Sequence, residues 1–337
     1  MSWQKQLKGD ALSWLLEPDP VNPGVRYFAL RDVLGKTRHD PEVIFARDEV
    51  MNSGPVPVIL ASQHPDGYWF KPGPGYSPRH RGTTWRLIQL ALLGADGSDP
   101  CIQQGCDYVL DHSRSDLGGF SYNGTRSAMV QCLQGNLVAA LIELGCYQDE
   151  RLQKALHWLA CSITGEGIAP CTASDAPVRY YQSGNSAPGF VCAYNNQLPC
   201  AWGAVKSLWA LSKVPQIDRG EVVESAIRTG VEFLLSSDPA KAGYPMGYSQ
   251  KPNSTWFKLG MPVGYSCDFL QTLEVLCALG MAKDLRLQPA TEQLLKKQDE
   301  MGRWWMEHSY NWVDIEEKGK PSKWVTLRAL RVLSQVY

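Results

Sequence analysis

The chain has 337 residues, 44% hydrophobic content and a formal net charge of −1. This length and apolar content allow one large core or two ordinary domains, and the lack of a basic stretch argues against nucleic acid as a partner. The first ten residues, MSWQKQLKGD, contain no apolar segment typical of a signal peptide, and no run of about 18 apolar residues follows. We therefore expect a cytoplasmic protein with no transmembrane segment.

An apolar helix-like segment recurs six times along the chain. Four copies end in Leu-Gly, and a glycine at this point is typical of a helix that stops in the left-handed conformation. The segments have few long polar side chains, so we expect helices that are buried on nearly all sides. The six segments are residues 25–35, 82–94, 134–145, 201–212, 268–280 and 324–336.

Amphipathic segments alternate with these apolar ones. Asp40-Pro41 and Asp99-Pro100 each combine a helix N-cap with a proline at the first helical position, and Asp149 opens a third segment in a related way. In residues 150–160 the leucines and alanines recur at helical spacing on one face. The segment KGDALSWLL near the N-terminus supplies one more helix of this kind.

The alternation predicts an all-α fold in which six buried helices form an inner ring and six amphipathic helices an outer one. This is a single (α/α)6 toroid over residues 1–337. Three long stretches rich in proline and glycine (71–78, 169–199 and 243–262) then cover one mouth of the barrel. Loops of this length in a compact domain are usually functional.

A Gln-x-x-x-Gly-x-Trp pattern occurs at residues 63–69 and again at 298–304. It resembles the QW motif of squalene–hopene cyclases and related terpenoid cyclases, whose toroidal fold is shared with protein prenyltransferase β-subunits. The resemblance implies that the glutamine caps an outer helix and stacks on the tryptophan, tying adjacent hairpins together. Weaker copies are found at residues 116–123, 164–171 and 241–248. The resemblance speaks to the fold, and a fold does not fix function.

Acidic residues are the first candidates for catalysis. Class II terpenoid cyclases protonate an alkene with the middle Asp of Asp-x-Asp-Asp, and the nearest match is DIEE at residues 314–317, which includes Glu316. The lysines around it favour solvated acids instead. Asp268 lies at the first turn of an inner helix, beside Cys267 and Tyr265. It either serves the helix N-terminus or faces the cavity as a proton carrier.

His80 follows a Pro/Gly-rich loop and precedes an inner helix, where it can act as an acid or a base or lie exposed in the loop. Cys200 and Cys267 are its candidate partners. Linalool dehydratase-isomerase, another toroidal enzyme, resembles this chain in combining Cys, His, Asp and Tyr, although only at the level of the fold.

Aromatic side chains at the loops and first turns suggest a cavity for an apolar or cationic ligand, although such rings also serve as packing joints between helices. The candidate substrate-binding residues are Tyr76, Arg81, Trp85, Tyr122, Cys171, Cys192, Trp202, Trp305 and Trp324.

Cofactor signatures are missing from the sequence. No P-loop, no Rossmann fingerprint and no Asp-rich diphosphate–magnesium motif occurs. The zinc site of prenyltransferase β-subunits is not expected, because the position that bears their histidine has none here, and no other metal-ligand spacing is found. We therefore expect neither a cofactor nor a metal.

These features favour an enzyme that takes a small apolar molecule into a central cavity for cofactor-free acid–base chemistry, namely isomerisation, cyclisation or hydration/dehydration. A hydrolase or carbohydrate-active lyase is the first alternative, and it needs two cavity acids about 5–10 Å apart, with Asp268 and Glu316 as the pair. A non-catalytic toroid that binds a small molecule is the second, and it needs no tuned acids.

Overall fold

The computed structural model describes residues 3–180, 186–262, 264–309 and 315–337. In these residues the chain is predominantly helical, as predicted, and its only strands are three two-residue pieces. The strands pair antiparallel in the order β1-β2-β3, with Cys192 opposite Leu198. They are β1 (Ser186–Ala187), β2 (Val191–Cys192) and β3 (Leu198–Pro199).

The apolar segments fold into helices close to the predicted bounds. Helix α5 shows their character, because only Arg86 and Leu92 among its residues are less than fully buried. Helix α2 continues as a π-helical segment, η2 (Ala29–Val33). These helices are α2 (Pro23–Phe28), α5 (Thr83–Leu93), α7 (Gln131–Glu143), α9 (Ala201–Ser212), α11 (Phe269–Ala278) and α13 (Lys323–Val336).

The amphipathic segments form the second set of helices. The predicted aspartate caps are present, since Asp99 accepts hydrogen bonds from the Cys101 and Ile102 amides and Asp149 accepts one from Arg151. The second set is α1 (Ala11–Leu16), α3 (Pro41–Asn52), α4 (Pro55–Leu60), α6 (Pro100–His112), α8 (Glu150–Thr164), α10 (Glu221–Leu235) and α12 (Gln288–Lys296). Short 3-10 turns are η1 (Trp3–Gln6), η3 (Arg126–Ala128), η4 (Ala193–Asn195), η5 (Gln216–Asp218), η6 (Ser254–Phe257) and η7 (Leu285–Leu287).

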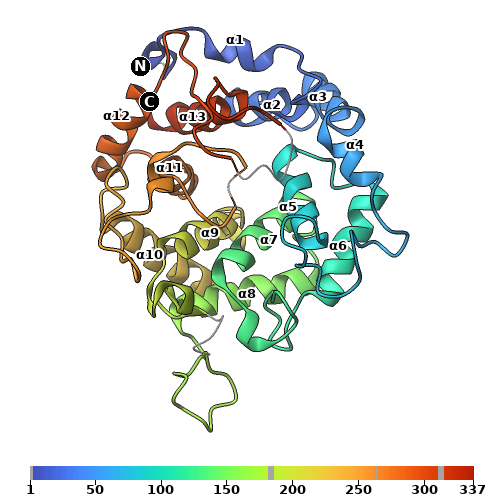
Figure 1. Ribbon diagram of the computed structural model, residues 1–337, viewed down its shortest axis with the longest axis vertical. Helices are drawn as coiled ribbons and strands as arrows, with labels where there is room; N and C mark the ends of the chain where they lie inside the picture. Colours follow the sequence, from blue (N-terminus) through green and yellow to red (C-terminus); the bar gives the residue numbers. More distant parts are fainter. Residues whose placement is uncertain (1–2, 181–185, 263, 310–314) are drawn as a thin grey trace.

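Figure 1 shows how the two sets are arranged. Helices α2, α5, α7, α9, α11 and α13 lie around the middle of the molecule, and the second set lies at its periphery. Successive inner helices from α5 to α13 contact one another, and α13 contacts α2. Gly24 places α2 directly against α5, because a Cβ at this position would meet the Leu93 carbonyl oxygen at 2.2 Å. The two termini lie close together at the top left of Figure 1.

Trp69 and Trp304 occupy the same structural joint. The indole of Trp69 donates to the carbonyl of Ile59 at 2.8 Å, and the indole of Trp304 donates to the carbonyl of Leu294 at the same distance. In each case the acceptor lies ten residues earlier, at the end of an outer helix. The backbone amide of each tryptophan also donates to a threonine hydroxyl in the first turn of an inner helix, at 3.0 Å.

Two of the three weaker copies keep this bond with other donors. Tyr244 donates its hydroxyl to Leu234 at 2.9 Å, again ten residues back. Phe120 has no polar atom, and there Arg114 donates to the Leu110 carbonyl instead, at 2.6 Å. In residues 164–171 the Gly-x-Trp spacing puts Ala169 two residues after Gly167, and Ala169 has no side-chain donor, so this segment does not repeat the joint.

The glutamines of the two strong copies tie neighbouring segments, and Gln298 also caps its own helix, because its amide donates to the Leu295 carbonyl of α12 at 3.3 Å. The Gln63 amide donates to the carbonyl of Cys101, in the first turn of α6, at 2.9 Å. The Gln298 amide donates to the Gln6 carbonyl at 3.1 Å and its oxygen accepts from the Lys8 amide at 3.1 Å. The second joint therefore fastens the last outer helix to the N-terminal segment.

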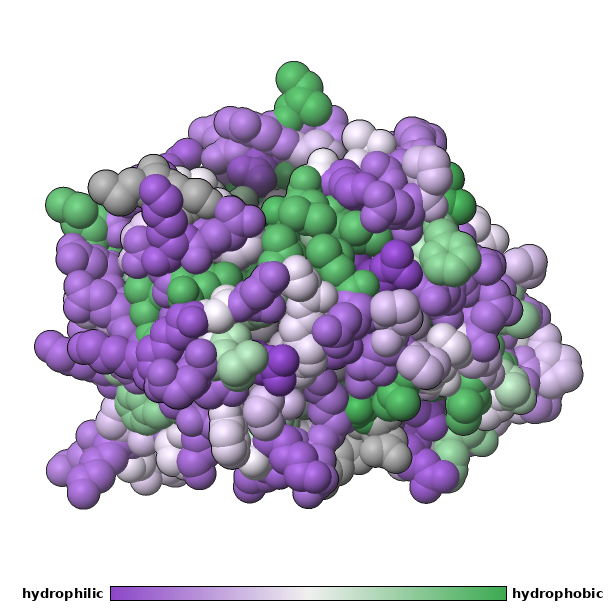
Figure 2. Space-filling view, turned by 90° about the horizontal axis from the view of Figure 1, so that it is seen from above, coloured by the Kyte–Doolittle hydropathy of each residue, from purple (hydrophilic) through white to green (hydrophobic). Residues whose placement is uncertain are grey.

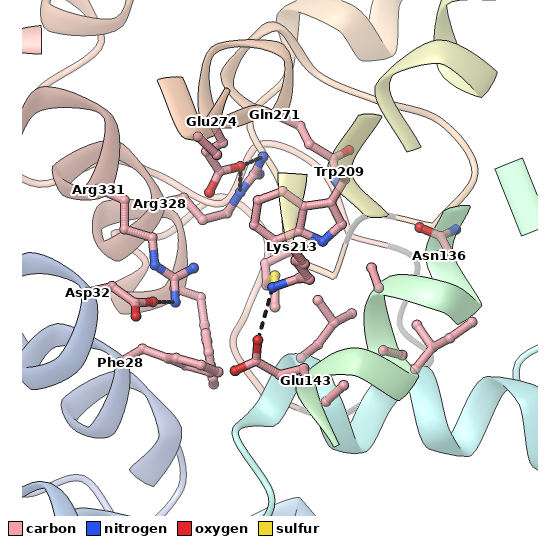
Figure 3. A pocket seen from close by; sticks show the side chains of 18 of the residues that line it. Phe28, Asp32, Asn136, Glu143, Trp209, Lys213, Gln271, Glu274, Arg328 and Arg331 are labelled. Atoms are coloured by element: carbon pink, nitrogen blue, oxygen red, sulfur yellow. Dashed lines mark hydrogen bonds and ion pairs between the residues drawn. The ribbon is translucent and has the colours of Figure 1, made fainter. Parts of the chain in front are cut away.

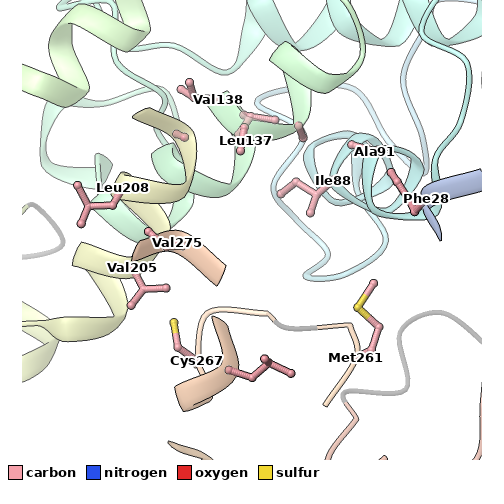
Figure 4. Close-up of a cluster of buried hydrophobic side chains, with 14 of the residues drawn as sticks. Phe28, Ile88, Ala91, Leu137, Val138, Val205, Leu208, Met261, Cys267 and Val275 are labelled. Carbon is pink, nitrogen blue, oxygen red and sulfur yellow. The ribbon is translucent and has the colours of Figure 1, made fainter. Parts of the chain in front are cut away.

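A contiguous apolar core runs between the inner helices, as Figure 4 shows for Ile88, Leu137, Val205 and Val275. On the outside, Figure 2 shows apolar side chains gathered in the middle of one face and surrounded by hydrophilic ones. In the described residues, no helix has the length and apolar character needed to cross a bilayer.

Candidate functional site

A cavity of about 360 Å³ lies among the inner helices (Figure 3). All six of these helices contribute to its walls, together with Met261 from the loop before α11. The lining residues are Phe28, Arg31, Asp32, Ile88, Ala91, Leu92, Asn136, Ala139, Ala140, Glu143, Trp209, Lys213, Met261, Gln271, Glu274, Ala278, Trp324, Arg328, Arg331 and Gln335.

The hollow lies toward the C-terminal halves of the inner helices. Helix α7 lines it with Asn136, Ala139 and Glu143, and α9 lines it only with Trp209 and its C-cap residue Lys213. Among the N-terminal turns of the same helices, only Gln271 of α11 and Trp324 of α13 border it. We expected the site at those N-terminal turns, but most lining residues lie further along the helices, such as Trp209, about two helical turns after the start of α9.

At the opposite end of the ring, aromatic side chains of the described residues pack against one another. Trp85 is fully buried there, with ring centroids 5.4 Å from Tyr76, 5.3 Å from Tyr265 and 4.7 Å from His80. Tyr76 continues this row to Tyr122 at 5.6 Å. These predicted residues therefore come together, but as a packed aromatic cluster rather than as the wall of the described hollow.

Charged side chains at the cavity form a continuous network. Glu143 accepts hydrogen bonds from Arg31 and from Lys213, the latter at 2.9 Å. Arg31 also binds Asp32, which in turn pairs with Arg331 at 2.6 Å. Helices α7 and α9 are thus joined through their charged side chains to η2 and α13.

This network keeps its carboxylates ionised. Burial alone would raise the pKa of Glu143, but Lys213 and Arg31 together hold that pKa far below its usual value. Asp32 behaves in the same way, since Arg331 and Arg31 outweigh burial and lower its pKa. Both groups therefore carry negative charge at neutral pH.

Asp268 is buried, and both of its carboxylate oxygens accept hydrogen bonds. Its Oδ1 accepts from the Gln271 amide at 2.7 Å, which caps α11, and its Oδ2 accepts from the Gly260 amide at 3.1 Å. Both oxygens also accept from Arg328, which pairs with Glu274 as well at 2.7 Å. Asp268 therefore holds the loop before α11 in place and does not line the cavity.

Glu316 plays a similar part for α13. Its carboxylate accepts from the Ser322 hydroxyl and from the Lys323 amide, the latter at 2.7 Å. Burial raises the pKa of Glu316, although these hydrogen bonds oppose the rise. Glu316 is half-buried and hydrogen-bonded rather than fully solvated, and like Asp268 it is outside the cavity lining. Asp314 of the same motif lies outside the described residues.

His80 has a left-handed backbone with φ of 68° and packs its ring on Trp85. Burial, together with the nearby charge of Arg79, lowers the pKa of His80 to about 4. The ring is consequently neutral at pH 7. Its neighbour Arg81 is exposed and lies over the ring of Phe70, so it does not contribute to the cavity.

The predicted thiols separate into different surroundings. Cys200 donates to Cys192, and this hydrogen bond lowers the pKa of Cys192 to about 7 against the effect of burial. Burial raises the pKa of Cys267 to about 11. Cys171 is half-buried in the loop after α8.

The remaining predicted aromatics are scattered. Trp324 lines the cavity and donates its indole to the Asn22 side chain at 2.9 Å. Trp202 packs near Trp256 with ring centroids 6.4 Å apart. Trp305 is 45% exposed.

The charged network was not predicted from the sequence. Its signal was present, because Arg31, Asp32 and Glu143 are charges within apolar helical segments, which costs free energy unless they are paired. The other members are Lys213 and Arg331, and a separate pair, Arg328 and Glu274, also lines the cavity.

In the described part of the chain, no three His, Cys, Asp or Glu side chains are grouped so that they could hold a metal ion. The sequence matches no known family model and no curated protein.

Among solved structures, the chain resembles the type II terpene cyclase MstE from Scytonema in its apo form. The identity is 15%, the match covers 83% of this chain and 95% of the cyclase, and the TM-score is 0.33. A variant of that cyclase in complex with geranylgeranyl dihydroxybenzoate gives 14% identity, coverage of 83% and 94%, and a TM-score of 0.35. Similarity at this level does not tell what this chain does.

Proposed function

We propose that residues 1–337 form a single (α/α)6 toroid whose central cavity binds a small, mostly apolar molecule with an anionic end. The observation that carries this proposal is the composition of the cavity wall, which is apolar over much of its surface and charged at one side. A hollow of about 360 Å³ is within the range of small-molecule sites.

The apolar part of the ligand would pack against aromatic and aliphatic side chains. Phe28, Trp209 and Trp324 offer ring surfaces, and Ile88 and Met261 complete an apolar lining. Small residues such as Ala139 leave the space between them. Transfer of apolar surface from water to such a wall supplies affinity of about 25 cal/mol per Å².

The anionic end would bind at the arginines. Arg31 and Arg331 present planar guanidinium groups, which suit a carboxylate. The Nε of Arg331 is buried and lacks a hydrogen-bond acceptor within the described residues. A ligand carboxylate that exchanges with Asp32 would satisfy this donor without leaving a charge unpaired.

The reaction proposed for this site is cofactor-free acid–base chemistry, namely isomerisation, cyclisation or hydration/dehydration. Glu143 and Asp32 are ionised, so they can stabilise positive charge but cannot donate a proton. The rings of Phe28 and Trp209 would add stabilisation for a cationic intermediate. The carbohydrate alternative loses support, since Asp268 and Glu316 are both occupied at helix N-termini.

Calorimetric titration with long-chain unsaturated carboxylic acids and the matching alcohols tests the binding proposal. The acids should bind in the micromolar range, and the alcohols about tenfold or more weakly because they lack the charge. The Ala139→Trp substitution should abolish binding of the acids and of the alcohols, because the tryptophan side chain would fill the hollow. Equal affinity of the Ala139→Trp variant and the unmodified protein would place the site elsewhere. Mass spectrometry of the acids after incubation then reports isomers, cyclised products or hydrated products.

A further inference from the structure

Lys206 is a fully buried lysine on the inner helix α9. It precedes Trp209 by three residues and Lys213 by seven, so the three side chains share one face of the helix. Trp209 and Lys213 line the central cavity, and Lys206 lies on the same face one turn deeper. Its side chain is therefore directed toward the floor of the hollow rather than into the outer layer.

The amine has neutral polar partners. Lys206 Nζ donates to Gln271 Oε1 at 2.5 Å, and Gln271 itself lines the cavity (Figure 3). The thiols of Cys132 and Cys267 face the amine from α7 and from the turn before α11, and burial raises the pKa of these thiols to about 12 and about 11. Both thiols are uncharged at neutral pH, so neither balances a charge on the amine.

Asp268 is an acidic group that acts on Lys206, but Arg328 binds both of its oxygens. No carboxylate in the described part of the chain lies within ion-pair distance of Lys206 Nζ. An ammonium group buried without a counter-ion costs several kcal/mol, which favours the neutral amine.

Lys213 provides an internal comparison on the same helix face. Its Nζ pairs with Glu143 at 2.9 Å, so this lysine has the carboxylate counter-ion that Lys206 does not have among the described residues. A neutral amine is a nucleophile and an ammonium ion is not, so the two lysines differ in what they can do at the same cavity.

We propose that Lys206 is a carbonyl-reactive amine that forms an imine with an aldehyde or ketone held in the central cavity. The amine nitrogen attacks the carbonyl carbon, the nitrogen loses its two protons, and the carbonyl oxygen leaves as water when the C=N bond forms. The side chain of Gln271 must turn away to admit the carbonyl. The inference rests on the proposed binding function, because the carbonyl compound enters the same hollow.

The electrostatic surroundings of Lys206 agree with its position in assigning it as the reactive amine. Burial is the main cause that lowers the pKa of Lys206, and Arg328 adds to it, while Cys267, Asp268 and Cys132 act in the opposite direction. A lysine desolvated in this way is the type of group that enzymes use for imine formation.

The test is reductive trapping of the full chain with hexanal and sodium cyanoborohydride at neutral pH. The cyanoborohydride delivers hydride to the imine and leaves a stable secondary amine, which peptide mass spectrometry locates. We expect the hexyl group on Lys206 at a rate at least tenfold above that on Lys213. Equal rates at the two lysines, or an unmodified Lys206, would overturn the proposal.

Two variants sharpen the result. Lys206→Met keeps the length of the side chain and should remove the fast-labelled site, with circular dichroism as the check on folding. Gln271→Ala should raise the labelling rate at Lys206 severalfold, because it removes the side chain that covers the amine. This measurement tests the proposal even if Lys206→Met does not fold. A slower rate in Gln271→Ala would contradict access through the cavity.

Titration with the unsaturated acids separates this inference from the binding proposal. If the acids bind while Lys206 stays unlabelled, the proposed reactivity of the amine is refuted and the proposed binding function of the cavity still holds. Labelling of Lys206 that the bound acid blocks would support both.

Discussion

The guanidinium of Arg328 donates to both carboxylate oxygens of Asp268, with Nη1–Oδ2 at 2.8 Å and Nη2–Oδ1 at 2.9 Å. The same guanidinium donates to the Gly260 carbonyl at 2.6 Å, and Asp268 accepts from the Gly260 amide. This arrangement fastens the loop before α11 to α13. It gives Asp268 a positioning role. In the sequence, the place of Asp268 at a helix start was compatible with either this role or a catalytic one.

Breaking this pair should destabilise the fold. Because both side chains are buried, Arg328→Met leaves Asp268 without its counter-ion and should reduce the free energy of unfolding by about 3–5 kcal/mol. Urea denaturation measures the change. Glu317→Gln serves as the control, since the pair of Glu317 with Lys320 is largely exposed and should be worth less than about 1 kcal/mol. Similar losses of unfolding free energy in the two variants would argue against a stabilising role for the Arg328–Asp268 pair.

The two tryptophan joints should respond alike. Trp69→Phe and Trp304→Phe each remove an indole donor from a buried carbonyl and some packing volume, so each should cost about 2–4 kcal/mol. Thermal and urea unfolding measure the effect, with the half-exposed Trp305→Phe as a control that changes stability little. A large loss at one joint and none at the other would show that they are not equivalent.

His80 should make stability depend on pH. The folded chain holds its pKa at about 4, whereas the unfolded chain has the usual value of about 6.5, so between these values only the unfolded chain binds the proton. The free energy of unfolding should therefore be highest above pH 6.5 and fall as the pH drops toward 4.

Urea denaturation across this pH range tests the assignment. The variant His80→Asn tolerates the left-handed backbone and should flatten the dependence. The exposed His39→Asn variant should leave it unchanged. An identical pH profile for His80→Asn and the unmodified protein would remove His80 as the cause.

Much of the helical layout was readable from the sequence. The apolar segments ending in Leu-Gly predicted inner helices such as α5, and Gly94 ends that helix with φ of 85° as the motif requires. The spacing of Gln63 and Trp69 predicted a repeated joint. The bond that defines the joint was not predicted, because it runs from the indole to a carbonyl ten residues earlier.

The position of the cavity could not be read in this way. Helix starts looked like a site because loops gather there, but Tyr265 and Trp85 pack against each other at that end. Which end of a ring stays hollow depends on how a loop folds across it, and Arg328 fixes that loop from 68 residues away. Paired charges within apolar helices, such as Glu143, were the better guide to the cavity.

A crystal structure of the protein with a bound unsaturated carboxylic acid tests the central claim most directly. The account predicts ligand density between Trp324 and Ala139, with the carboxylate at Arg31 and Arg331. Density beside Trp85 at the other end of the inner helices, or a cavity closed by side chains with no ligand in it, would contradict the account.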